Sequence, residues 1–543
     1  MSTKISLLPP ECLAEILSYV KVDGIDITDP MTYPVNLYLV CKAWRAIALS
    51  TAELWSRIRV DIDRYEAVHT PPSPEEPPTP TEDRLMHSTI LNTLKSCLDR
   101  SKLQPLTICI RARSLLPSHQ TDSSSVNTEI SNKRKDLLGS ILVVLLHNSN
   151  RWFDVDFDFP LDLFVFILPS GRNYPLLRRL VIGRGSGNLQ ADWLGTNIDS
   201  LLSTVTPIRG TFSNAPQLIQ LELCGLPICI SQLSLPWHQI THLELSLHDI
   251  FTHGRHFIRN MGQLISLKLC QLSTGPLPVD LSHLPLAPST EQLVSIECAN
   301  LEELSLVCRR EIPQSATMFF STLRIPRLTM LQIQSSLSLQ HNNLGEWIPA
   351  FRTCISRSDC PVRRLTLKKM DGATALAVLG ALPDIKDLVL EEIHFTNKLM
   401  SGLTYPRHSK RRSVSLSPSK APLVGTKISR LVVHKPRFIN DIEGPNQFMN
   451  MIRSRLPVHT SPSVQTSEQT GAPYGSRTKA PVPGASLAAL RVTGVSPRRL
   501  EPTLDTPGGS SVTLYQLLVQ QVLKYNGDII RVEPDEEGEL TEC

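Results

Sequence analysis

Three aspartates at alternate positions come closest to a chemical site in this sequence. Asp154, Asp156 and Asp158 stand in the segment Trp152–Phe159, separated by apolar residues. Alternate side chains of a strand point to the same side, so this spacing would bring the three carboxylates together. Three carboxylates can hold a hard cation such as calcium. They could also be the solvated face of a strand, or an acidic patch for a basic partner.

Other catalytic motifs are missing from the sequence. It has no glycine-rich phosphate loop, no HExxH, no GxSxG and no paired Cys/His spacing for a metal. We therefore expect a protein that is not an enzyme and that needs no cofactor and no metal. A metal-dependent hydrolase built around Asp154, Asp156 and Asp158 is the rival hypothesis from another class.

The elements that would position such side chains show up as a repeated pattern, apolar-x-x-apolar-x-apolar. Neighbouring copies often start 22 to 27 residues apart, as expected for leucine-rich repeats. Each copy predicts a short strand, and helix-like stretches lie between copies at Asn342–Ser356, Ala373–Leu382 and Asn440–Leu456. Strand and helix alternating at this period predict an α/β solenoid, a horseshoe in which each unit packs on its neighbours. The clearest copies start at Leu218, Ile240, Leu264, Leu301, Leu328, Val362, Ile385 and Ile428, and weaker ones at Leu103, Trp152, Leu177 and Leu487.

The repeats are irregular, because the Asn or Cys expected three residues after the last leucine is missing. Alternation along the strands predicts a polar concave face that would bind a protein target. Acidic groups dominate its early part, and Arg364 with Lys368 makes a local basic spot. An ordinary mixed surface without a hot spot is the alternative. The candidate target-binding residues are Asp154, Asp156, Asp158, Glu222, Glu244, Lys268, Arg364 and Lys368.

The first 60 residues predict a separate helical module. A helix should begin at Pro9-Pro10-Glu11, since proline fits a first helical turn and an acidic residue suits the positive end of the helix dipole. A second apolar periodicity runs from Leu37 to Ala48, and Leu54, Trp55 and Ile58 continue it as a third short helix. A module this small buries little surface and would lean on a partner or on the next domain.

This stretch resembles an F-box, closest to the expanded F-box-like families of fungi. The resemblance rests on Leu8-Pro9-x-Glu11-x-Leu13-x-x-Ile16-Leu17, on Val40-Cys41-Lys42-x-Trp44-Arg45-x-Ile47-Ala48, and on Leu54-Trp55. It implies docking on the Skp adaptor of a cullin–RING ubiquitin ligase, with the repeats as receptor for a protein substrate. One departure is a long loop between Lys21 and Asn36. The residues implied in adaptor binding are Leu8, Pro9, Leu13, Ile16, Leu17, Val40, Cys41 and Trp44. The alternative is an F-box-like repeat scaffold outside any ligase.

Composition agrees with a folded chain of more than one unit. The chain has 543 residues, 41% of them hydrophobic and 20% charged, and its net charge of +4 gives no case for nucleic acid. The first 20 residues are unlike a signal peptide, and the longest apolar run, Ile141–Leu146, is too short to span a membrane. Twelve cysteines without a CxxC pair favour free thiols in a reducing compartment. These observations predict a soluble intracellular protein of the cytoplasm, the nucleus or both.

Lys410-Arg411-Arg412, followed by serines, is a basic loop that could be a nuclear-import signal, a phosphorylation switch or an ordinary polar loop.

The expected domains follow from these patterns. We expect an F-box-like domain at residues 5–60, a proline-rich linker or loop at 67–83, degenerate repeats at 85–495 with polar insertions at 115–135, 401–427 and 457–483, a C-terminal helix and cap at 511–532, and an acidic tail at 533–543.

Overall fold

The computed structural model of this chain divides into two compact units, Met1–Gln292 and Leu293–Cys543. The residues that the structure describes are 9–19, 25–29, 37, 39–63, 80–112, 125–159, 172–183, 212–223, 235–246, 261–271, 296–308, 314–335, 347–404, 427–438, 444–455, 487, 489–493, 504–505, 511–512 and 530–533. No helix within these ranges is long and apolar enough to cross a membrane.

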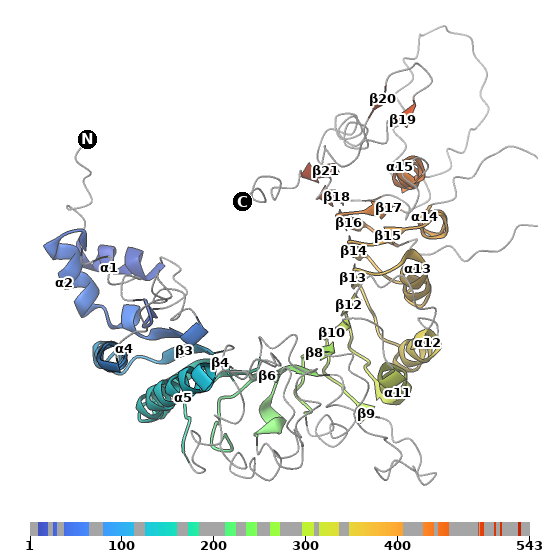
Figure 1. Cartoon of the computed structure of the whole chain (residues 1–543). Coiled ribbons are helices and arrows are strands. Elements are labelled where there is room, and N and C mark those ends of the chain that lie inside the picture. Colours follow the sequence, from blue (N-terminus) through green and yellow to red (C-terminus); the bar gives the residue numbers. More distant parts are fainter. Residues whose placement is uncertain are drawn as a thin grey trace, which may run out of the picture. The chain divides into compact units, whose positions relative to one another are not determined.

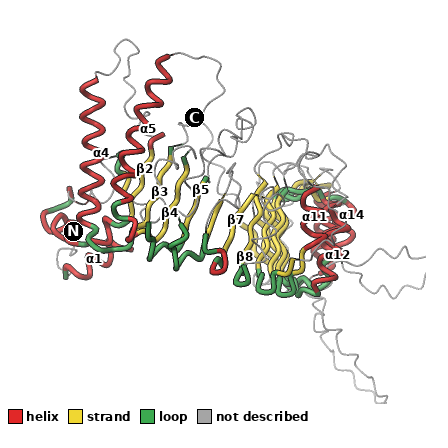
Figure 2. The backbone as a smooth tube through the Cα atoms, turned by 90° about the horizontal axis from the view of Figure 1, so that it is seen from below, coloured by secondary structure: helices red, strands yellow, loops and turns green. Residues whose placement is uncertain are grey.

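Unit 1 is built on a parallel sheet whose strands follow one another in chain order, from β1 to β8 (Figure 1). Helices α4 and α5 run beside β2, β3 and β4 (Figure 2). The elements are α1 (Pro10–Tyr19), β1 (Ile25–Asp26), α2 (Lys42–Ser50), η3 (Ala52–Trp55), β2 (Arg57–Asp61), α4 (Pro80–Arg100), β3 (Leu106–Arg111), α5 (Ser125–Leu146), η5 (Ser149–Arg151), β4 (Trp152–Asp158), β5 (Arg179–Ile182), β6 (Gln220–Leu223), η8 (Trp237–Gln239), β7 (His242–Ser246) and β8 (Ser266–Gln271).

Unit 2 repeats the same plan, with helices α11 to α15 along one side of a parallel sheet (Figure 1). The strands of this sheet follow the order β10, β12, β13, β14, β16, β18 and β21. The elements are β9 (Ile296–Glu297), β10 (Glu303–Cys308), α11 (Gln314–Thr322), β11 (Leu323–Arg324), β12 (Met330–Gln334), α12 (Trp347–Ser358), β13 (Arg364–Lys368), α13 (Gly372–Gly380), β14 (Asp387–Glu391), β15 (His394–Phe395), α14 (Asn397–Leu403), β16 (Arg430–His434), β17 (Arg437–Phe438), α15 (Gly444–Arg455), β18 (Ala489–Thr493), β19 (Leu504–Asp505), β20 (Ser511–Val512) and β21 (Ile530–Glu533).

The apolar positions of the repeated pattern form columns through the sheet. In unit 2 the leucines at the second residue of each strand are paired from β10 to β18 and all are buried. Each of the twelve predicted copies coincides with a strand, from β3 to β18, and the α/β class with a large parallel sheet is confirmed. Burial of a full leucine side chain contributes about 1.5–3 kcal/mol, so these columns are the main source of cohesion between neighbouring strands.

The predicted third N-terminal helix is wrong. Residues 52–55 form only the single turn η3, and Ile58 lies in β2, which pairs in parallel with β3. Ile58 and Val60 are buried and alternate with charged residues, which is the period of a strand. Trp55, Ile58 and Val60 are thus a further copy of the repeated pattern, and β1 adds a strand from the long loop before α2. The F-box-like stretch therefore runs directly into the sheet.

Three predicted loops contain helical residues, since α14 extends to Leu403 and so enters the expected insertion at 401–427. The helix α4 begins at Pro80, inside the expected linker, because proline is tolerated in a first turn. The helix α5 begins at Ser125, inside the first expected insertion, because polar residues can extend a helix that its apolar half nucleates. The remaining parts of the insertions, including Lys410–Arg412, lie outside the described residues except for Thr404 and Lys427, and so does the acidic tail except for Glu533, which ends β21. So does the expected C-terminal helix, except for the strand residues Ser511–Val512 and Ile530–Val532.

Arginines link one helical layer to the next. The last carbonyls of a helix have no partner within it and attract cationic donors. Arg151 donates to the carbonyl oxygens of Gln104 at 3.0 Å and Leu98 at 3.4 Å, just beyond and within the last turn of α4. Arg357, on α12, donates in the same way to Phe320 at 3.0 Å near the end of α11. Arg455, on α15, donates to Leu403 at the end of α14.

Gly372 is required by close packing at the start of α13. A Cβ added there would lie 2.6 Å from the carbonyl oxygen of His394 and 2.7 Å from Oγ1 of Thr396. Gly372→Ala should therefore lower the free energy of unfolding by about 1–3 kcal/mol, measured by urea denaturation. The matched control is Gly139→Ala within α5, where the added Cβ meets nothing within 4 Å and a gain of about 0.5–1 kcal/mol is expected. Equal behaviour of the two variants would contradict the packing of β15 on α13.

Candidate functional site

Exposed aliphatic side chains are concentrated in the N-terminal module. Of the eight exposed large hydrophobic residues in the described part of the chain, four fall between Ile16 and Leu49. They are Ile16 at 49% exposure on α1, Leu39 at 69% and Val40 at 57% before α2, and Leu49 at 38% on α2. The helices α1 and α2 contact each other, and both lie at the N-terminal end of unit 1 (Figure 1). We call these four residues the N-terminal apolar patch.

The predicted adaptor-binding residues divide into two groups. Pro9, Ile16, Val40 and Cys41 are exposed, whereas Leu13 and Leu17 are buried and form the interior of the module. Trp44 is half-buried, and Leu8 lies outside the described residues. Leu39 and Leu49 were missed, because helical periodicity alone does not tell which apolar positions stay uncovered.

The position of α2 is determined by its two ends. Cys41 is the N-cap, with extended backbone, and its Sγ accepts a hydrogen bond from the backbone N–H of Trp44 at 3.5 Å. At the other end, the indole Nε1 of Trp55 donates to the carbonyl oxygen of Ala48 at 2.7 Å. Trp55 is 1% exposed, and the guanidinium of Arg100 lies 4.4 Å from its ring centroid. Trp55 and Arg100 thus connect α2, which carries part of the patch, to α4.

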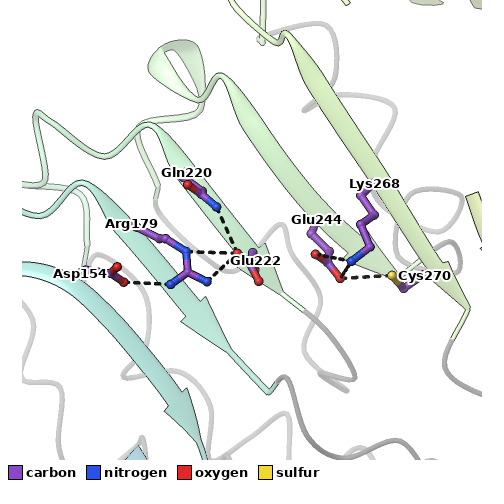
Figure 3. Close-up of polar contacts among 7 residues, drawn as sticks. All are labelled: Asp154, Arg179, Gln220, Glu222, Glu244, Lys268 and Cys270. Atoms are coloured by element: carbon purple, nitrogen blue, oxygen red, sulfur yellow. Dashed lines mark hydrogen bonds and ion pairs between the residues drawn. The ribbon is translucent and has the colours of Figure 1, made fainter. Parts of the chain in front are cut away.

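A second candidate surface is the polar face of the sheet in unit 1. Arg179 on β5 bridges two neighbouring strands, since Nη1 lies 3.0 Å from Oδ1 of Asp154 and Nη2 lies 2.8 Å from Oε1 of Glu222 (Figure 3). Further along, Nζ of Lys268 lies 2.9 Å from Oε1 of Glu244. The thiol of Cys270 donates to the same carboxylate oxygen at 3.2 Å. We call these contacts the ion ladder.

The aspartates of β4 are not equivalent. Asp154 is paired with Arg179, Asp156 is half-buried, and Asp158 is buried, so the prediction of three solvated carboxylates is wrong for Asp158. A register shift between Leu106 and Thr107 also disturbs the alternation, with Trp152 in the core in place of Phe153. In the described ranges, no group of three or more His, Cys, Asp or Glu side chains is arranged to hold a metal ion.

The polar face of unit 2 also carries ion pairs between strands. Arg364 on β13 has its Nε 3.7 Å from Oδ2 of Asp387 on β14. Lys368, at the other end of β13, has its Nζ 2.7 Å from Oε2 of Glu391. Each member of the predicted basic spot therefore faces a carboxylate on the next strand.

Arg179 should matter most among the ladder residues. Burial alone would lower the pKa of its guanidinium, but the hydrogen bond and charge of Glu222, with Asp154, outweigh burial and raise the pKa above its usual value. Arg179→Met would leave the Glu222 side chain, only 8% exposed, without its ion pair. We expect a loss of about 2–3 kcal/mol in the free energy of unfolding at neutral pH.

The matched control for Arg179→Met is Lys268→Met, because the Lys268 side chain is 42% exposed. Its pair with Glu244 should contribute no more than about 1 kcal/mol. Both variants can be compared by urea denaturation followed by circular dichroism. Equal losses for the two would mean that Glu222 does not depend on Arg179.

Comparison with known proteins identifies the N-terminal region. Residues 5–61 match the F-box-like family model, and this match ends at the last residue of β2. Comparison with curated proteins gives no match. A crystal structure of a protein from Bacteroides fragilis, determined by a structural genomics consortium, is 11% identical and covers 50% of this chain and 80% of that chain. Its TM-score of 0.24 is too low to support an argument. The chain is thus an α/β protein with an F-box-like region at its N-terminal end.

Proposed function

We propose that this protein is a non-catalytic substrate receptor of a cullin–RING ubiquitin ligase. Its F-box-like region would bind the Skp adaptor, and the strand–helix repeats would hold a protein target near the ubiquitin-conjugating enzyme. Proximity is then the mechanism, since the conjugating enzyme supplies the chemistry. The observation that carries the proposal is the N-terminal apolar patch, which lies within residues 5–61, the F-box-like match.

The patch has the character of an unfilled interface. A partner that covers exposed aliphatic side chains gains about 25 cal/mol of hydrophobic stabilisation for every Å² of apolar surface that it buries. On this proposal the four side chains form one contiguous surface, and exposed apolar surfaces of this kind mark protein-binding sites in soluble proteins. Leu13 and Leu17, on the same helix as Ile16, are buried and anchor α1, so docking would need little rearrangement.

The target-binding half of the proposal extends to the repeats. The parallel strands in chain order, the leucine columns and the helices along one side support a degenerate leucine-rich-repeat solenoid, with the polar face as target surface. On this proposal Asp156, Glu244 and Lys268 offer polar contacts from unit 1, and Arg364 and Lys368 from unit 2, whereas the buried Glu222 acts by holding Arg179 in place. The protein would work in the cytoplasm, the nucleus or both.

The direct test is binding of the full-length chain to purified Skp adaptor, measured by biolayer interferometry. The full chain is needed because β2 pairs with β3 and Trp55 packs under Arg100, so an isolated N-terminal fragment would lose its support. We expect saturable binding. A folded chain that does not bind would overturn the proposal.

Thiol alkylation can locate the docking site. Cys41, beside Val40, is exposed, so iodoacetamide should modify it early. Burial raises the pKa of Cys97 and of Cys354 to about 11, which keeps both thiols protonated and slow to react. Bound adaptor should protect Cys41 and leave the buried thiols unchanged. Adaptor binding without protection of Cys41 would place the interface elsewhere on the chain.

One observation favours a second candidate, an F-box-like repeat scaffold outside any ligase. The long loop before α2 contains β1, which pairs with β2, and the backbone N–H of Thr28 donates to Asp26 at 3.0 Å. This added structure lies within the F-box-like region and would oppose docking if it shielded the patch. Deletion of residues 25–29 tests the point. Gain of adaptor binding only after deletion would support the scaffold.

A further inference from the structure

A group of cations marks the beginning of the strands in unit 2. Arg363 directly precedes β13, Lys386 directly precedes β14, and Arg430 is the first residue of β16. All three side chains are exposed. The backbone N–H of Lys386 donates to the carbonyl oxygen of Arg363 at 2.9 Å, so these two residues are neighbours across the sheet. We call Arg363, Lys386 and Arg430 the basic edge.

The basic edge is not neutralised, in contrast to the opposite ends of the same strands. There, Lys368 is paired with Glu391 at 2.7 Å, and Arg437 with Glu392 at 2.7 Å. Within the part of the chain that the structure describes, Arg363, Lys386 and Arg430 have no ion pair with a carboxylate, although the register of β14 and β16 sets Arg430 opposite Asp387. Exposed cations without a carboxylate partner therefore gather at this edge of the three strands.

Two further cations flank the basic edge, but each has a carboxylate nearby. Arg364 lies 3.7 Å from Asp387, and Lys427 is paired with Asp384. These carboxylates prevent Arg364 and Lys427 from adding much net charge.

We propose that the basic edge binds an acidic peptide segment of the protein target. Neighbouring strands are about 4.8 Å apart, so Arg363 and Arg430, separated by β14, are on the order of 10 Å apart. An extended peptide covers this distance with about three or four residues, and its alternate side chains are ~7 Å apart. Two carboxylates of such a segment can meet Arg363 and Lys386, and a third can reach Arg430, which is in register with Arg364 and Asp387. The assignment of this peptide as the target rests on the proposed function.

A peptide fits the edge better than nucleic acid does. Proteins that bind single-stranded nucleic acid combine a continuous basic groove with aromatic side chains for base stacking. Asp384 and Asp387 interrupt the cations here, and Asp384 is exposed. No described residue from Arg363 to Lys369, Asp384 to Glu391 or Lys427 to His434 is a Phe, Trp or Tyr. Individual carboxylates of a flexible peptide can avoid the two aspartates, whereas evenly spaced phosphates cannot.

The test uses the full-length protein and a fluorescein-labelled peptide of alternating aspartate and glutamate, followed by fluorescence anisotropy. The triple variant Arg363→Gln/Lys386→Gln/Arg430→Gln should weaken binding by roughly tenfold, because each exposed ion pair contributes modestly. The control variant Lys95→Gln/Arg352→Gln/Lys398→Gln removes the same charge from exposed helical positions and should bind as the wild type does. All three substituted edge residues are exposed, so folding should be unaffected, which circular dichroism checks.

Each outcome decides the proposal. It is overturned if the wild type does not bind the acidic peptide, if the triple variant binds as tightly, or if both variants lose binding equally. A single-stranded DNA oligonucleotide of the same charge, bound more tightly and lost in the triple variant, would assign the edge to nucleic acid instead. Skp-adaptor binding of the same samples separates the two proposals. Peptide binding without adaptor binding would reject the ligase role and keep the edge, and the reverse would reject the edge alone.

Discussion

The double variant Ile16→Asp/Val40→Asp should weaken binding to the Skp adaptor by about 100-fold or more. Both side chains are about half exposed in the free chain, so charged replacements add no buried charge and should leave the melting temperature nearly unchanged. In the complex, each aspartate would be desolvated against an apolar partner surface without an opposite charge. A penalty of ~2 kcal/mol or more at each position is typical of an interface centre. Biolayer interferometry with the full-length chain measures this effect.

Two controls make the double variant decisive. Val143→Asp introduces the same charge at a residue of similar exposure on α5, far from the patch in sequence, and should bind the adaptor normally. Leu13→Asp places a charge at a buried position of α1 and should disrupt the module itself, visible as lost helical signal. If Ile16→Asp/Val40→Asp binds the adaptor like the wild type, the patch is not the docking surface and the adaptor binds another part of the chain.

Trp55→Ala should be the most destabilising single substitution in the N-terminal module. It removes a fully buried ring, its hydrogen bond to Ala48 and its contact with Arg100. Truncation of a buried tryptophan typically costs about 3–5 kcal/mol. The loss should appear in urea denaturation and as faster hydrogen exchange in α2, since Trp55 holds the end of that helix.

The comparison with Trp44→Ala tests the structural assignment of the two tryptophans. Trp44 is half-buried and no hydrogen bond from its ring is present in the described structure, so its removal should cost only about 1–2 kcal/mol. The F-box resemblance placed Trp44, and not Trp55, among the adaptor-binding residues, whereas the structure makes Trp55 the anchor of the module. A larger loss for Trp44→Ala than for Trp55→Ala would contradict this order.

The strands could be predicted from the sequence because their signal is local. Leu365 and Leu367, for example, alternate with Arg364, Thr366 and Lys368, and this period makes only one face of the strand apolar. The F-box resemblance likewise rests on short-range spacing, and the match over residues 5–61 agrees with it. The third helix expected through Leu54, Trp55 and Ile58 was predicted wrongly beyond Trp55, because Trp55 and Ile58 fit both a helical and a strand period, and the pairing of β2 with β3 decides between them.

Only the tertiary structure decided which apolar side chains stay exposed and which cations stay without an ion pair. Leu13 and Ile16 are equivalent by periodicity, yet packing of α1 against α2 and η3 buries the first and exposes the second. Arg364 and Arg363 are adjacent cations, yet only Arg364 faces a carboxylate, because the register of β13 and β14 sets Asp387 beside it. Burial and ion pairing depend on residues tens of positions apart. The sequence gives the identity of these residues, but the distances between their side chains are determined only when the strands lie side by side.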